Sequence, residues 1–130
     1  MVKASFTITA LLTSVLLLPA RLVAAETAQY THIKPLLLAA IDAPDGKASG
    51  ILTGPLASLF KTTTGSKYPL LATVTTVGDF SQPGCKRLNL HLQQQGVRTT
   101  SNESKKFEVS YGLNLCRNGE APSRGSGLRN

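Results

Sequence analysis

Apolar and polar residues alternate most clearly in the second half of the chain. Across residues 86–93 three leucines occupy every second position and the intervening residues are polar, and a similar alternation runs through 107–116. A period of two places successive side chains on opposite faces of a strand. Both segments are therefore predicted to be half-buried strands, and the polar stretch 99–106 between them is predicted to be an exposed loop.

A third extended segment is predicted over residues 69–80. It is rich in Leu, Ala, Val and Thr, and both of its alternating faces are fairly apolar. This pattern is typical of a central strand that is covered on both sides. Residues 81–84, with the sequence Ser-Gln-Pro-Gly, should form the turn that follows it.

The first half of the chain predicts a turn and one short helix. The apolar segment 33–41, broken early by Pro35, is followed by the turn-forming residues 42–46, so we expect a reversal into an extended segment near 49–53 and a hairpin. After Pro55, three apolar residues at i, i+3 and i+4 spacing predict a helix of two to three turns. Gly65 should end it. The three stripe residues are Leu56, Leu59 and Phe60.

The beginning of the chain has the form of a secretory signal peptide. Lys3 precedes an apolar segment, and small residues precede a cleavage point after Ala25. Residue 26 is Glu rather than Cys, which argues against a lipid-anchored lipoprotein. We expect residues 1–25 to be removed, residues 26–117 to form a single domain, and residues 118–130 to form a flexible tail rich in Gly, Ser and Arg.

Export changes how the two cysteines, Cys85 and Cys116, are interpreted. In an oxidising compartment a disulfide is the default state of such a pair, and antiparallel pairing of the two predicted strands would bring these residues together. A reactive thiol or a metal site is the alternative, but neither a Cys-x-x-Cys pair nor clustered His accompanies them. The predicted fold is α+β: an antiparallel sheet of three to five strands, one short helix and one disulfide.

The chain is basic, with a formal net charge of +7. Because Lys3 and Arg21 leave with the leader, twelve basic residues remain against seven acidic ones, and the net charge falls to +5. This balance suits an anionic surface or an acidic protein partner, or it serves solubility alone. The candidate contacts to an anionic partner are the adjacent pairs Lys86, Arg87 and Lys105, Lys106.

Candidate catalytic residues are few. The two histidines, His32 and His91, together with a lysine could supply the acid, base and cation of a small secreted nuclease. Nothing in the local sequence positions either ring. No nucleophile elbow, phosphate-binding loop or metal-ligand spacing is present, so the sequence predicts neither a cofactor nor a metal.

Three short sequence segments resemble those of a known group of proteins. They are residues 50–55 (Gly-Ile-Leu-Thr-Gly-Pro), 84–88 (Gly-Cys-Lys-Arg-Leu) and 114–119 (Asn-Leu-Cys-Arg-Asn-Gly). In this order they resemble small exported proteins of Gram-negative bacteria that are encoded with conjugation or type IV secretion machinery. The resemblance implies a periplasmic accessory role in an envelope-spanning assembly and a structural role for both cysteines. It transfers no catalytic residue.

Three functions therefore follow as hypotheses. The first is an exported, non-enzymatic periplasmic accessory or binding protein with a protein partner in the cell envelope and no membrane span after cleavage. The second is a small secreted basic hydrolase that uses His91 and His32. The third is a secreted inhibitor or a toxin-like domain.

Overall fold

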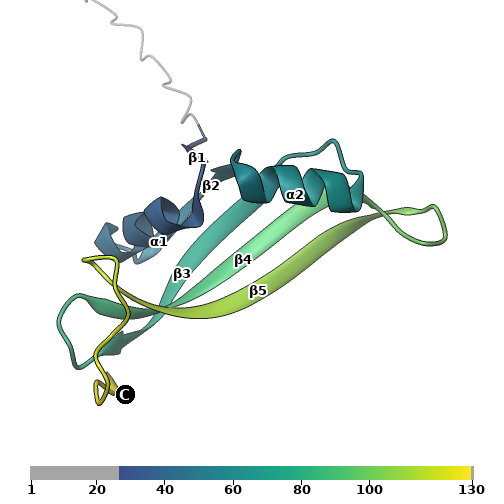
Figure 1. Cartoon of the computed structure of the whole chain (residues 1–130). Helices are drawn as coiled ribbons and strands as arrows, with labels where there is room; N and C mark the ends of the chain where they lie inside the picture. Colours follow the sequence, from purple (N-terminus) through teal and green to yellow (C-terminus); the bar gives the residue numbers. More distant parts are fainter. Residues whose placement is uncertain (1–26, 130) are drawn as a thin grey trace, which may run out of the picture.

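The computed structural model describes residues 27–129 as one sheet with two helices on one side of it (Figure 1). The predicted leader, residues 1–25, lies outside the described residues. Within the described part, no helix is both long and apolar enough to cross a membrane. In chain order the elements are β1 (Gln29–Tyr30), α1 (Ile33–Asp42), β2 (Lys47–Leu52), α2 (Pro55–Thr64), β3 (Leu70–Phe80), β4 (Cys85–Arg98), β5 (Ser104–Cys116) and β6 (Leu128–Arg129).

The sheet has six strands, more than the three to five predicted, and its class is α+β as expected. The main path runs β1-β2-β3-β4-β5, and β6 pairs with the end of β3. All pairs are antiparallel except β1 with β2, which α1 connects as a crossover. Because β5 ends this order, one of its two backbone edges has no neighbouring strand in the described chain (Figure 1).

The structure has two helices rather than the single one predicted. Segment 33–41 forms α1 and not the first strand of a hairpin, because Leu36, Leu37, Ala40 and Ile41 form one buried helical face. Pro35 is compatible with this helix since it lies in the first turn, where backbone N–H groups have no intrahelical partner.

The one helix that was predicted, after Pro55, is confirmed as α2. Gly54 precedes it, Pro55 begins it, and Gly65 ends it in the left-handed conformation with φ 65°. A residue without a Cβ adopts this conformation at little cost, which explains why the helix ends there.

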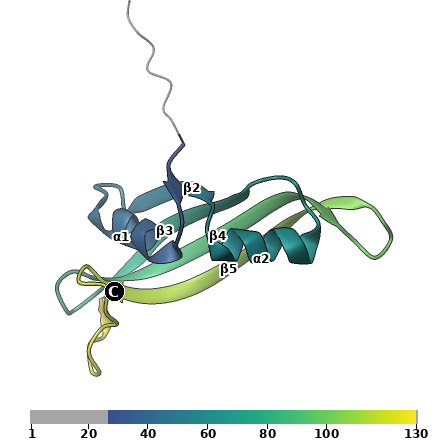
Figure 2. The same cartoon turned by 45° about the horizontal axis from the view of Figure 1, so that its top comes forward.

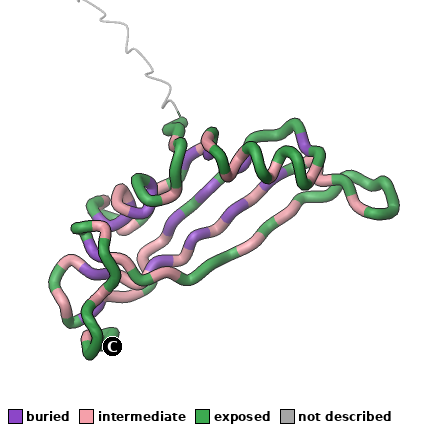
Figure 3. The backbone as a smooth tube through the Cα atoms, in the orientation of Figure 1, coloured by how far each residue is buried: buried purple, intermediate pink, exposed green. Residues whose placement is uncertain are grey.

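The core lies between the helices and one face of the sheet. Leucines at alternate positions of β4 pack under α1, beside Leu70 and Val74 of β3. Buried segments accordingly concentrate along β3, β4 and α1, whereas β5 is largely exposed or intermediate (Figure 3). The β4 residues in the core are Leu88, Leu90 and Leu92.

The opposite face of the sheet is open, so the prediction that β3 is covered on both sides is wrong. Leu71 and Val77 on this strand are 37% and 60% exposed. Sequence alternation could not show this, because threonine and valine suit a strand on a solvated face as well as on a buried one. The turned view shows α1 and α2 on the same side of the sheet (Figure 2).

The predicted disulfide between Cys85 and Cys116 is present, and these residues are opposite each other in the β4–β5 pairing. With Phe80 they form a small second cluster of buried side chains. The chain after the disulfide stays near this end of the sheet: the Ser81 N–H donates to the Gly127 carbonyl (2.8 Å) before β6 pairs with β3.

Candidate functional site

The two helices leave an apolar groove beside β5. Its volume is about 680 Å³, within the range of about 300–1,000 Å³ typical of ligand sites. The groove forms because α1 packs mainly on β2, β3 and β4, while the helix-side residues of β5 extend beyond the helix layer. Its walls come from α1 and α2, and its floor comes from β4 and β5.

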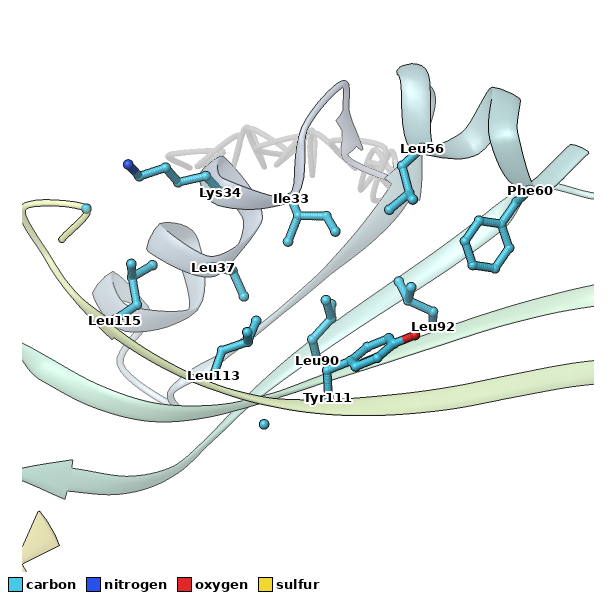
Figure 4. A pocket seen from close by; sticks show the side chains of 12 residues that line it. Ile33, Lys34, Leu37, Leu56, Phe60, Leu90, Leu92, Tyr111, Leu113 and Leu115 are labelled. Atoms are coloured by element: carbon cyan, nitrogen blue, oxygen red, sulfur yellow. The ribbon is translucent and has the colours of Figure 1, made fainter. Parts of the chain in front are cut away.

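Apolar side chains from these four elements point toward one another across the groove (Figure 4). Tyr111 on the floor is 50% exposed, which is high for a large side chain in an otherwise apolar setting. At the α2 end, the rings of Phe60 and Phe107 meet edge to face with centroids 5.8 Å apart. The apolar side chains lining the groove are Ile33, Leu37, Leu56, Phe60, Leu90, Leu92, Tyr111, Leu113 and Leu115.

A buried polar contact anchors the end of α2 to the sheet. The Thr64 hydroxyl donates to the Gln94 side-chain oxygen (2.9 Å), and the Gln94 amide donates to the Tyr68 carbonyl (3.1 Å). Gln94 is only 2% exposed, so both ends of its amide need such partners. This contact holds the α2 wall of the groove in place.

Among the described residues that line the groove, Lys34 has the only charged side chain. Its ammonium lies at the rim near Gly119, where a Cβ added to that glycine would be 3.0 Å from the Lys34 nitrogen. No acidic side chain within residues 27–129 lies within ion-pair distance of Lys34. The groove therefore combines an apolar interior with one positive charge at its edge.

The two candidate catalytic histidines lie far apart in the fold. His32 precedes α1 on the helix side, where its Nδ1 lies 3.1 Å from the Thr31 hydroxyl. His91 faces the open side of β4, where its Nδ1 lies 3.0 Å from the Ser110 hydroxyl. The sheet separates the rings, so they do not face a common substrate.

The open face also holds a Ser, His and carboxylate group that sequence reasoning missed. His91 Nε2 lies 3.6 Å from Glu108, too far for a hydrogen bond. The Lys106 ammonium donates to that carboxylate at 2.8 Å, and this hydrogen bond is the main reason that the pKa of Glu108 is lowered. Alternation across the paired strands would have predicted that His91, Ser110 and Glu108 lie close together, but none of the three lines the apolar groove.

The four basic residues singled out from the sequence divide between the two ends of the β4–β5 hairpin. Three have an acidic neighbour: Lys86 pairs with Asp79, Lys105 lies 3.8 Å from Glu103, and Lys106 contacts Glu108. Arg87 differs.

The Arg87 guanidinium lies over Gly112 and donates to the Asn114 side-chain oxygen at 2.8 Å. No carboxylate of the described chain pairs with it.

Comparison with known protein families, curated proteins and solved structures finds no match for this chain. Among residues 27–129, no group of three or more His, Cys, Asp or Glu side chains is arranged to hold a metal ion. The apolar groove is consequently the feature of the fold best suited to binding.

Proposed function

We propose that this protein is an exported, non-enzymatic binding protein that holds an apolar segment of a protein partner in the groove between its helices and β5. The observation that carries the proposal is the groove itself, an open apolar site built from four elements. No histidine, carboxylate or cysteine side chain belongs to its lining within residues 27–129. Burial of apolar surface would supply the affinity.

The partner that fits this groove is an apolar segment flanked by an acidic residue. An acidic group beside the apolar segment would pair with Lys34 at the rim. The basic character of the mature chain favours approach of such a partner. The predicted signal sequence and the resemblance to accessory proteins of conjugation and type IV secretion systems support a location in the periplasm and a partner in an envelope assembly.

A charge placed in the groove tests this function. Ile33→Asp puts a carboxylate at the groove wall, and its position in the first turn of α1 suits a negative charge, so the helix should tolerate it. Val77→Asp is the matched control, because Val77 is 60% exposed and is not part of the groove lining.

The assay is chemical cross-linking and capture from envelope extracts of the native host. Wild type and Val77→Asp should recover the same specific component, and Ile33→Asp should recover at least tenfold less of it. Equal recovery by all three proteins, or a wild-type protein that returns alone, would contradict groove binding. Mass spectrometry of the exported protein tests the location independently, with a mature start at Glu26 and no free thiol expected.

A further inference from the structure

Among residues 27–129, no strand pairs with the outer edge of β5, which is regular and carries unpaired backbone groups. The Cys116 N–H donates to the Glu120 carbonyl (2.8 Å), whereas the Arg117 N–H donates to the carbonyl of Gly84, the residue before β4 (2.8 Å). Even-numbered residues here thus direct their backbone groups away from β4. Since this direction alternates along an antiparallel strand, the outward-facing residues are Glu108, Ser110, Gly112 and Asn114.

This free edge has two definite limits. At one end, the outward N–H of Cys116 already donates a hydrogen bond to the Glu120 carbonyl. At the other, a bulge in β4 between Gln94 and Val97 interrupts the regular pairing just beyond Phe107. The regular, unoccupied stretch therefore spans residues 107–115, and its midpoint is Tyr111.

We infer that this edge pairs with the same edge of a second copy of the chain, antiparallel and about a two-fold axis at Tyr111. Centring the axis there gives the largest overlap of the regular stretch with itself. In this register Ser110 lies opposite Gly112 of the second copy, and Glu108 lies opposite its Asn114. These residues direct backbone donors and acceptors outward on both chains, so they can form ladder hydrogen bonds.

The side chains are complementary in this register. On the helix side, apolar residues meet apolar residues: Val109 lies opposite Leu113, and Tyr111 lies opposite its own copy. On the open side, Glu108 approaches the Asn114 that Arg87 of the second copy already contacts. The pairing thus brings the Glu108 carboxylate of one copy toward the Arg87 guanidinium of the other, which has no acidic partner within the described residues of its own chain. The two-fold axis relates two such contacts in the dimer.

Gly112 has a physical reason to be in the middle of this strand. A Cβ at this position would lie 2.5 Å from an Arg87 guanidinium nitrogen, so the missing side chain lets Arg87 extend across β5 toward the free edge. A shift of the axis to residue 109 would instead place Lys106 opposite Gly112, beside Arg87. That like-charge contact disfavours the alternative register.

A single cysteine tests both the pairing and its register. Tyr111→Cys should form an intermolecular disulfide on mild oxidation, because directly opposite residues have Cα atoms about 4.5–5.5 Å apart, within disulfide reach. Val109→Cys is the control on the same face. Its two copies would be offset by four residues, or about 14 Å, which prevents a disulfide. Equal cross-linking of both variants, or of neither, would overturn the inference.

A second pair of variants tests the backbone contact without a new thiol. Ser110→Pro removes an N–H that faces outward, so the ladder to β4 is retained while pairing with a second copy is blocked. Ser110→Ala loses the same contact to His91 but keeps the N–H.

Light scattering after size exclusion should show dimers for wild type and Ser110→Ala, and monomers for folded Ser110→Pro. A monomeric wild type over about 10–200 µM would overturn the pairing, and a dimeric Ser110→Pro would place the contact elsewhere. Neither result bears on whether the groove binds a partner, which Ile33→Asp tests separately.

Discussion

Removal of the disulfide should cost a large part of the stability of this small domain. The bridge joins residues separated by 31 positions. For a loop of that length, the chain-entropy relation gives a loss of about 3.7 kcal/mol when Cys85→Ala and Cys116→Ala are combined. Small domains have only about 5–15 kcal/mol of net stability. The corresponding decrease in melting temperature is roughly 15–20 °C.

Urea denaturation followed by far-UV circular dichroism measures this loss. The double variant and the reduced wild type should lose similar amounts of stability, because the main effect is on the unfolded chain. Their m-values should rise, since an unfolded chain without the bridge exposes more surface. A loss below about 1 kcal/mol in both proteins would refute the argument. A loss in the variant alone would assign the effect to packing around Phe80 rather than to the cross-link.

Two further predictions concern the core and an ion pair. Leu88→Ala should lower the free energy of unfolding by about 3–5 kcal/mol in urea titrations because this side chain is fully buried, whereas Leu59→Ala, at a position that is 60% exposed, should change it by less than about 0.5 kcal/mol. The pKa of Asp79 is lowered by its hydrogen bond with Lys86, so its contribution to stability is present above the ordinary carboxyl pKa of 3.8 and is lost as the pH falls below it. Asp79→Asn should therefore flatten stability against pH between about pH 2 and 5, and an unchanged profile would contradict the role of this pair.

Much of the local structure could be predicted from side-chain periodicity. Period-two alternation located β4 and the main part of β5, although the predicted loop 99–106 was too long, since β5 already begins at Ser104. The apolar stripe after Pro55, with Gly65 as its end, identified α2. These predictions succeed because they depend on conformational preferences and neighbours within a few residues.

The first apolar segment shows where such reasoning fails. Residues 36–41 are apolar at every position, so their pattern fits a buried strand as well as a buried helix. Contact with the β-sheet selects the helix, since it buries Leu36 and Ala40 on one face. For the tail, the sequence predicted flexibility over 118–130. In the structure, Ser123 donates its N–H to the Gln82 side chain at 2.7 Å.

The candidate site was missed because it belongs to no single segment. Its apolar lining comes from α1, α2, β4 and β5, and each of these apolar residues has the pattern of an ordinary core position. His32 and His91 were candidate catalytic residues because histidine is rare in this chain and reactive, yet the two side chains lie on opposite sides of the sheet. Tyr111, which the sequence placed on the apolar face of a strand, is half exposed on the groove floor.

The sequence by itself determined the leader prediction, the alternating strands, the second helix and the pairing of the only two cysteines. These depend on composition, on local backbone preference and on the register of one hairpin. Only the tertiary structure decided that both helices cover the same face and leave β5 extending beyond them. That placement creates the groove and the free edge, because whether an apolar side chain is buried depends on which distant element covers it, and its own neighbours in sequence do not specify this.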